Sequence, residues 1–187
     1  MIFQETVLKN AYTIDLEPFT DDRGLFARTF CKKEFANIGH HKEFVQFNHS
    51  RSNYTGTLRG MHFQKAPAAE VKLIRCIRGS IFDVIVDLRK SSPTFLQYFG
   101  VELSEQNMRM IYVPEGFAHG FQTLQDYTEL IYHHTAFYAP DQDGGIRYND
   151  PRINIQWPLA ITSISEKDKN YPFLPDAYEN IDLGFRN

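Results

Sequence analysis

Cysteine is scarce in this sequence: the 187 residues include two, Cys31 and Cys76. Both are isolated and lack CxxC spacing, which argues against a disulfide framework and favours a reducing compartment. We interpret both as packing residues, because free cysteine usually behaves as a small hydrophobic side chain. Also missing are a run of roughly 18 apolar residues, which a membrane span needs, and a basic N-terminal segment followed by an apolar run. We therefore expect a cytoplasmic protein that does not enter the membrane.

A large excess of charge of either sign is missing as well, since 20 basic and 23 acidic residues give a net charge of −3. Nucleic acids and anionic membranes are bound through broad basic surfaces, which this balance does not favour. No nucleic-acid or membrane partner is therefore expected. An anionic ligand would have to be bound by cations that gather locally.

Aromatic residues make up 14% of the chain, and short runs of Val, Ile, Phe, Tyr and Thr recur between turn signals. Such runs predict many short strands. Turn signals spaced about ten residues apart favour a sandwich or jelly roll over alternating β–α units. The clearest predicted strands are residues 44–50, 57–64, 71–79, 80–89, 108–114, 119–124 and 128–140.

Helix signals are few. Residues 32–39 predict two turns that end at Gly39, and residues 165–169 begin with a plausible N-cap, Ser165. Neither segment is long enough to cover a parallel sheet. From about Asp141 onward the chain is richer in Asp, Asn, Pro and Gly, which predicts loops wrapped over a finished sheet. We expect one all-β domain, residues 1–187, with short peripheral helices.

The segment LRGMHFQ, residues 58–64, places one histidine in a predicted strand. Strict alternation would put His62 on one face with Leu58 and Gly60, and Arg59 on the other. Taken alone, His62 is best explained as a hydrogen-bonded structural residue. A glycine inside a strand, however, often marks a bulge or a close backbone approach. A bulge at Gly60 would bring Arg59 and His62 to one site.

The stretch PEGFAH, residues 114–119, matches the PxGxxH sequence of metal-binding cupin jelly rolls. A metal site of that kind would also need a His-x-His pair and a downstream glutamate. Here the second position of the pair is Gln64, a poor ligand for transition metals, and Glu70 is the acid left to complete a site. We expect no metal and no cofactor, so His119 needs another role.

Lys72 is in step with Ile74 and Cys76 on one face of a predicted buried strand. A lysine is almost never fully buried without a partner. Two interpretations are open: a strand-end residue whose ammonium reaches solvent, or a cation directed inward at an anion or a developing oxyanion.

Tyr132 and Tyr138 are six residues apart and would share a face if their strand is continuous. Either alone is typically a packing residue with a hydrogen-bonded hydroxyl. Asp168 follows Ser165 at the spacing of a helix cap, which is enough to explain it. Residues 20–24, TDDRG, predict a turn, and Arg23 gains a function only beside a phosphate.

Seven segments, in order, resemble one enzyme family: DDRGLFARTF, FVQFNHSRSNYTGTLRGMHFQ, KLIRCIRGSIFDVIVDLRKSSPTF, VPEGFAHGF, YHHTAFYAP, NDPRINIQWP and SEKD. The chain resembles the dTDP-4-dehydrorhamnose 3,5-epimerases. The resemblance implies a cupin-type jelly roll, or double-stranded β-helix, in a homodimer with shared active-site residues. It also implies metal-free epimerisation at C3 and C5 of a nucleotide-linked 4-keto-6-deoxyhexose. The expected reaction converts dTDP-4-dehydro-6-deoxy-D-glucose to dTDP-4-dehydro-L-rhamnose.

The resemblance also implies a role for each matching residue. His62 would be the base and Asp168 the carboxylate that orients it, because inversion next to a ketone begins with removal of a proton. Lys72 would stabilise the enolate, and Tyr132 would donate a proton to the other face. The residues implied in substrate binding are Arg23, Phe26, Arg28, Gln46, Asn48, Arg59, His119 and Tyr138.

Within that set, Arg23 and Arg59 would bind the diphosphate, and Tyr138 would stack on the thymine ring. Arg23 and Phe26 would serve the site of the partner subunit. Arg28 stands where the family often has a glutamate, so the identity of the nucleotide and of the sugar stays open.

Other departures from the family pattern are Phe47, where an aspartate is common, and the pair His133 and His134, where a lysine is usual. None of them affects the four residues implied in the chemistry. The alternatives left open are inversion at C3 or C5 alone, a shift of the keto group, a metal-dependent cupin enzyme, and a sugar-nucleotide-binding module without turnover.

Overall fold

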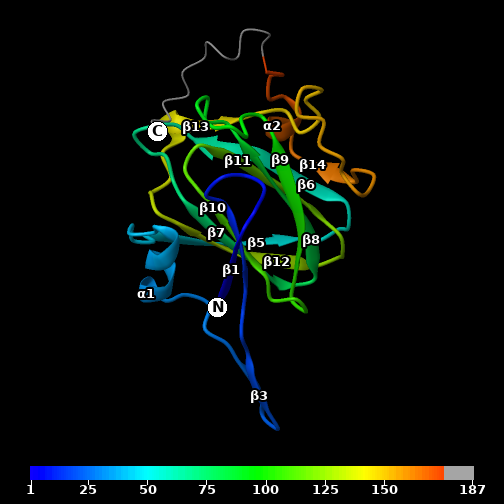
Figure 1. The fold of residues 1–187 in the computed structure, drawn as a ribbon. Coiled ribbons are helices and arrows are strands. Elements are labelled where there is room, and N and C mark those ends of the chain that lie inside the picture. Colours follow the sequence, from blue (N-terminus) through cyan, green and yellow to red (C-terminus); the bar gives the residue numbers. More distant parts are fainter. Residues whose placement is uncertain (175–187) are drawn as a thin grey trace.

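Two sheets pack face to face in the computed structural model, which describes residues 1–174 (Figure 1). This arrangement confirms the predicted all-β jelly roll, although the predicted domain end at residue 187 lies outside the described residues. The first sheet contains, in order, β1 (Ile2–Glu5), β2 (Tyr12–Asp15), β10 (Met110–Val113), β7 (Lys72–Arg78), β12 (Thr128–His134) and β5 (Gln46–Ser52). The second contains β13 (Asp143–Gly145), β6 (Thr57–Gln64), β11 (Phe117–Thr123), β8 (Ser80–Asp87) and β9 (Tyr98–Ser104), with β14 (Ser163–Ile164) parallel to β6.

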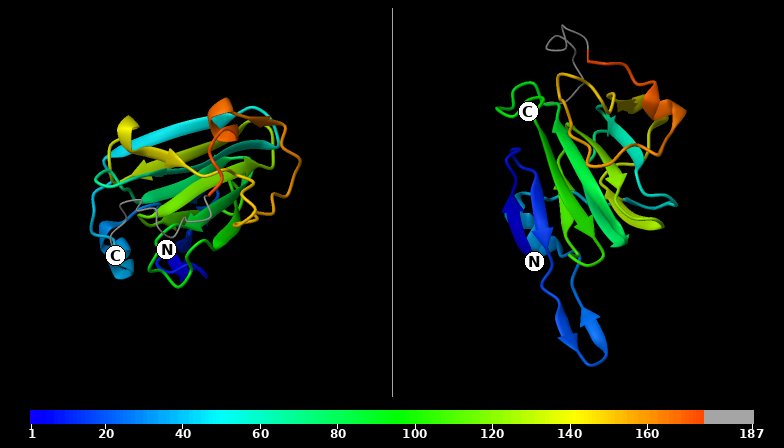
Figure 2. Two further views of the ribbon diagram at one scale, coloured as in Figure 1. Left: turned by 90° about the horizontal axis from the view of Figure 1, so that it is seen from above. Right: turned by 90° about the vertical axis from the view of Figure 1, so that its right-hand side faces the viewer.

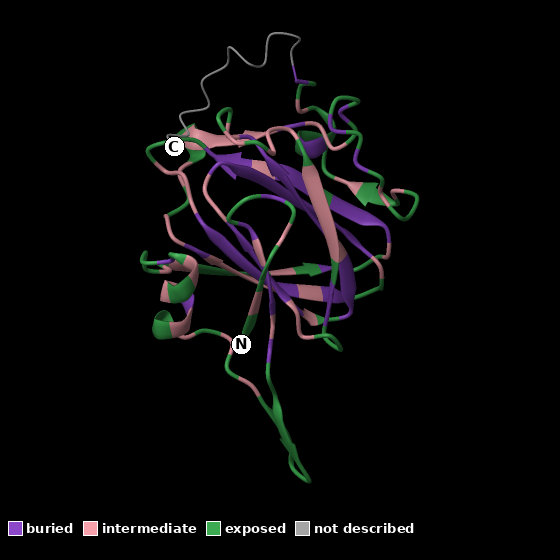
Figure 3. Ribbon diagram, viewed as in Figure 1, coloured by how far each residue is buried: buried purple, intermediate pink, exposed green. Residues whose placement is uncertain are grey.

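Part of the interior between the sheets is apolar. Ile74 and Cys76 of β7 meet Ile81 and Ile85 of β8 in one buried cluster, and Figure 3 shows buried residues along both sheets. Burial raises the pKa of the Cys76 thiol to about 11. Cys76 is therefore a packing residue, as predicted.

The chain after β13 covers the outer face of the second sheet. Val84 and Val86 of β8 pack there against Ile153 and Ile155 of this segment, which confirms the predicted loops over a finished sheet. The patterns did not predict that β13 and β14 would also pair with β6.

Strands β1 to β4 and β9 are not among the predicted strands. In β9, Gly100 lies against the Phe82 ring, and a Cβ there would come within 2.3 Å of it, so the alternation of side chains is interrupted. Strands β3 (Phe19–Asp21) and β4 (Gly24–Phe26) form a hairpin that projects from the body of the molecule (Figures 1 and 2). The hairpin is exposed along its whole length, so no buried face marks it in the sequence.

The helices are short and match the two predicted segments. Helix α1 (Lys32–Phe35) and the 3-10 turn η1 (Ala36–Ile38) end at Gly39, which has a left-handed φ of 78°. Helix α2 (Glu166–Lys169) follows its cap, Ser165, and a second 3-10 turn, η2 (Pro140–Gln142), follows β12. Across residues 1–174 no helix is long and apolar enough to cross a membrane.

Candidate active site

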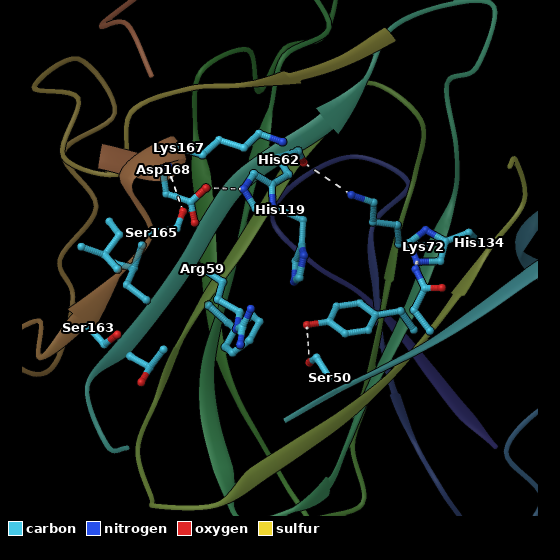
Figure 4. Close-up of a pocket in the computed structure, with 16 residues that line it drawn as sticks. Ser50, Arg59, His62, Lys72, His119, His134, Ser163, Ser165, Lys167 and Asp168 are labelled. Atoms are coloured by element: carbon cyan, nitrogen blue, oxygen red, sulfur yellow. Dashed lines mark hydrogen bonds and ion pairs between the residues drawn. The ribbon is translucent and has the colours of Figure 1, made fainter. Parts of the chain in front are cut away.

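A cavity of about 560 Å³ is lined by both sheets, by β14 and by α2. Figure 4 shows Asp168 and Lys167 of α2 on one side of His62, with Lys72 and His134 on the other. The residues predicted from the sequence that line the cavity are Asn48, Arg59, His62, Lys72, His119, Tyr132 and Asp168.

Strand β6 is irregular at Gly60, and the irregularity lets Arg59 and His62 line the same cavity. Opposite β11, the step from Arg59 to His62 contains one extra residue. Gly60 has a φ of 121°, and a Cβ there would lie 2.6 Å from Cα of Gly120. Both the backbone conformation and the close approach of β11 therefore require glycine. The predicted bulge is confirmed.

His62 and Asp168 form a hydrogen-bonded pair. Nε2 of His62 lies 2.7 Å from Oδ1 of Asp168, while Oδ2 accepts a hydrogen bond of 3.1 Å from the backbone N–H of Gly60. Burial alone would raise the pKa of Asp168, but these contacts together outweigh it and hold the pKa below its usual range. The helix-cap interpretation also holds, because the backbone N–H of Asp168 donates to the hydroxyl of Ser165. The backbone of Asp168 thus takes part in the helix cap, and its side chain binds His62.

Lys72 begins β7 and lines the cavity, with 11% of its side chain exposed. Its Nζ lies 3.4 Å from Oε1 of Glu70 and 3.5 Å from the carbonyl oxygen of His62. Of the two interpretations from the sequence, the structure matches the cation that is directed inward.

Tyr132 of β12 and His119 of β11 meet edge to face, with ring centroids 6.1 Å apart. Ser50 donates a hydrogen bond of 3.3 Å to the hydroxyl of Tyr132. Burial raises the pKa of Tyr132 well above its usual value, so the phenol stays protonated at neutral pH. Nε2 of His119 lies 2.8 Å from Oδ2 of the buried Asp83. The cavity is therefore lined by a protonated phenol and by two histidines that are each paired with an aspartate.

Arg59 and Asn48 add polar groups to the same cavity. Arg59 donates 3.2 Å to the hydroxyl of Ser52 and 3.3 Å to the carbonyl of Arg51. These partners are neutral, so the guanidinium keeps its charge available for an anion. Gln46 donates 3.3 Å to Oδ1 of Asn48 and lies just outside the cavity.

The β3–β4 hairpin and the segment after it carry three predicted binding residues, none of which lines this cavity. Arg23 and Phe26 are exposed on the hairpin, and Arg23 pairs with Asp21 at 2.6 Å. Arg28 pairs with Glu34 at 2.8 Å. Within one chain, these residues are separate from His62 and its neighbours.

Tyr138 also lies outside the cavity. The prediction of a continuous strand that aligns it with Tyr132 is wrong, because β12 ends at His134. The chain turns there, and the backbone N–H of Tyr138 donates 3.0 Å to the side chain of Gln46. Tyr138 is 57% exposed and lies beside the edge strand β5.

Several cavity residues were not predicted from the sequence. Ser165 and Lys167 precede Asp168 within SEKD, so the motif already contained them. His134 stands two residues after Tyr132, and strand alternation places both on one face. The unpredicted polar residues that line the cavity are Ser50, Thr57, His134, Ser163, Ser165 and Lys167.

Gln64, at the position where metal cupins have a second histidine, makes structural contacts. Its Oε1 accepts 2.7 Å from the backbone N–H of Ala139, and its Nε2 donates to the carbonyls of Ala68 and Phe137. Among the described residues, no three or more His, Cys, Asp or Glu side chains are arranged to hold a metal. The absence of a metal from the reaction stays a prediction.

A jelly roll whose interior holds a histidine–aspartate pair, a lysine and a protonated phenol defines a cupin-type protein with an acid–base site. The family model of dTDP-4-dehydrorhamnose 3,5-epimerase matches residues 5–176. The chain is 44% identical over 179 residues to the Salmonella typhimurium enzyme of that name, covering 95% of this chain and 97% of the relative. It belongs to the dTDP-4-dehydrorhamnose 3,5-epimerase family and is an epimerase of this class.

Two solved structures are similar over most of their length. The Bacillus anthracis dTDP-4-dehydrorhamnose 3,5-epimerase, with TDP and PPi bound, has a TM-score of 0.89 and 44% identity, covering 92% of this chain and 99% of that one. A 3'-monoepimerase from Streptomyces bikiniensis, in complex with dTDP-quinovose, has a TM-score of 0.84 and 30% identity, covering 90% of this chain and 85% of that one.

Proposed function

We propose that this protein inverts C3 and C5 of dTDP-4-dehydro-6-deoxy-D-glucose to give dTDP-4-dehydro-L-rhamnose. The observation that carries the proposal is that the pair of His62 and Asp168 shares one cavity with Lys72 and Tyr132. Similar structures with TDP or dTDP-quinovose bound support the nucleotide. A cytoplasmic location stays a prediction from the sequence.

Each inversion begins with removal of a proton next to the C4 ketone. Nε2 of His62 is engaged with Asp168, which leaves Nδ1 to accept that proton while Asp168 stabilises the imidazolium. Lys72, with His119 as a second polar contact, stabilises the negative charge on the C4 oxygen. Tyr132 returns a proton to the opposite face. No metal or cofactor takes part in these steps.

The nucleotide occupies the open side of the cavity. Arg59 binds the diphosphate, because its guanidinium is held by neutral groups and its fork fits phosphate oxygens. Asn48 and Gln46 supply neutral hydrogen bonds. Tyr138 stacks on thymine, which its exposed ring beside Gln46 supports.

We further propose a homodimer in which the β3–β4 hairpin completes the site of the partner. The hairpin exposes Phe19, at 78%, and Phe26, at 71%, an apolar surface that association would remove from water. In this dimer Arg23, with 90% of its side chain exposed, supplies a cation to the diphosphate that is bound at the partner's site. Arg28 lies in the segment that follows the hairpin.

Mixing two inactive variants tests the shared site. Arg23→Ala and His62→Ala should each reduce turnover. After an equal mixture is reassembled, about one quarter of all sites should be complete, because half of the dimers are mixed and each mixed dimer has one complete site. No recovery in mixed dimers verified by mass would contradict a shared site.

Solvent exchange followed by NMR tests the reaction itself. In heavy water the protein should exchange the C3 and C5 protons of dTDP-4-dehydro-6-deoxy-D-glucose for deuterium and form the L-configured product. Substrate that binds but gains no deuterium would indicate a binding module instead. Activity that is lost to a chelator and restored by one metal would indicate a metal-dependent cupin enzyme.

The similarity to a 3'-monoepimerase favours a second candidate, inversion at C3 alone. The same spectra separate the two, because the second candidate exchanges C3 and leaves C5 protonated. The identity of the exchanged carbon therefore decides between them.

A further inference from the structure

Glu70 and His134 form a buried pair beside the cavity that the proposed chemistry does not use. His134 of β12 is the register partner of Lys72 on β7. Nδ1 of His134 lies 2.8 Å from Oε2 of Glu70, and the other oxygen of Glu70 lies 3.4 Å from Nζ of Lys72. The side chain of Glu70 is 8% exposed and that of His134 10%. Figure 4 shows His134 directly beside Lys72.

Asn48 determines which nitrogen of His134 carries the proton. Nδ2 of Asn48 lies 3.3 Å from Nε2 of His134, and the amide orientation follows from Gln46, which donates to Oδ1 of Asn48. Nε2 of His134 therefore accepts, and Nδ1 donates to Glu70. Burial alone would raise the pKa of Glu70, but His134 and Lys72 together outweigh it and lower the pKa. Glu70 is thus an ionised carboxylate shared between His134 and Lys72.

We propose that His134 and Glu70 are positioning residues that hold the ammonium of Lys72 toward the C4 oxygen of the sugar. With one oxygen of Glu70 bound by His134, Lys72 stays between the other oxygen and the carbonyl of His62. Without His134, the carboxylate draws Lys72 closer to itself and away from the sugar, because a buried charge needs a compensating donor. The inference rests on the proposed function, since it concerns the residue assigned to the enolate.

Kinetics of three variants test the positioning role. His134→Ala should lower kcat about 5- to 100-fold, the effect of losing one hydrogen-bond partner of a buried charge, while the Kd for dTDP stays unchanged. His134→Asn should recover most of the loss, because its amide N–H can donate to Glu70. His133→Asn is the matched control, since His133 lies on the opposite face of β12 and should keep the wild-type kcat. A His134→Ala kcat equal to wild type would overturn the proposal.

A double-mutant cycle separates a shared role from two independent ones. If Glu70 and His134 act as a unit, Glu70→Ala combined with His134→Ala should lose no more kcat than the more impaired single variant. Losses that multiply would overturn the proposal, because each residue would then act by its own route.

A crystal structure of His134→Ala without substrate distinguishes a failure of this inference from a failure of the proposed function. Nζ of Lys72 should move toward Glu70 and away from the carbonyl of His62. If the wild-type protein exchanges no substrate protons and Lys72 still moves, the proposed function fails and the positioning role stands. If Lys72 keeps its place in the variant, the positioning role fails whatever the activity.

Discussion

Two histidine–aspartate pairs, whose histidines both line the cavity, have nearly the same hydrogen bond and different surroundings. The bond is 2.7 Å between His62 and Asp168 and 2.8 Å between His119 and Asp83. The side chain of His62 is 37% exposed, whereas that of His119 is 6% exposed. Substrate and solvent can therefore reach the ring of His62 more freely than the ring of His119, although both rings line the cavity.

The two carboxylates are both buried but differ in their hydrogen-bond partners. Asp168 comes from α2, and its second oxygen accepts the N–H of Gly60. Asp83 comes from β8, next to the strand of His119, and within residues 1–174 its second oxygen has no hydrogen-bond partner. Asp168 lines the cavity, so water from the cavity can take its place in a truncated variant, whereas Asp83 is fully buried and does not line the cavity. The hydrogen-bond length alone does not distinguish the two pairs, whereas the exposure of the two histidines does.

The largest effect should follow from removing the accessible histidine. His62→Ala should reduce exchange at both C3 and C5 by about 10²- to 10⁴-fold, the usual contribution of a general base, with the fold intact by circular dichroism. His49→Ala is the control, because His49 also pairs with a carboxylate, Glu129, but lies outside the cavity. Retained exchange in the His62 variant would remove it as the base.

The buried pair of His119 and Asp83 should contribute more to the free energy of unfolding than the more accessible pair of His62 and Asp168. Asp83→Ala should lower the free energy of unfolding by about 3 kcal/mol, because it leaves a buried imidazole without its partner. Asp168→Ala should cost about 1 kcal/mol, since water can reach His62 and replace the carboxylate. Urea unfolding of both variants measures the difference. Equal losses would show that access does not distinguish the pairs.

Five of the strands that line the cavity were predicted from short apolar and aromatic runs between turn signals, namely β5, β6, β7, β11 and β12, whereas β14 was not. The bulge was predicted because Gly60 lies inside a predicted strand, and a glycine at such a position often marks a bulge. The projecting hairpin was missed because no sheet covers either of its faces. A buried face, rather than strand geometry, is what produces a periodic sequence.

The partners of the site residues could not be predicted from the residues alone. Asp83 lies 36 positions before His119, and Glu70 lies 64 positions before His134. Which acid meets which histidine depends on the register between strands, and one shifted residue would turn a side chain to the other face. The 106 positions between His62 and Asp168 were bridged only through the resemblance to a family.

A smaller effect on the reaction should follow from removing the phenol hydroxyl of Tyr132, which lies beside His119. Tyr132→Phe should slow delivery of the proton to the new face by about 10²-fold, with a smaller effect on its removal. Product formation should then fall more than exchange into recovered substrate, as measured by NMR in heavy water. Equal loss of both steps would argue that Tyr132 binds substrate and transfers no proton.

The smallest effect concerns the dependence of stability on pH. The folded protein lowers the pKa of Asp168 below its unfolded value of about 3.9. A group of this kind stabilises the fold above its unfolded pKa, and the contribution is lost as the pH falls through the folded pKa. The urea midpoint of the wild type should fall on going from pH 5 to pH 3, and the midpoint of Asp168→Asn should fall less. If the urea midpoints of the two proteins change with pH in parallel, His62 does not stabilise the ionised form of Asp168. Asp168 would then not be the carboxylate that orients His62 as a base.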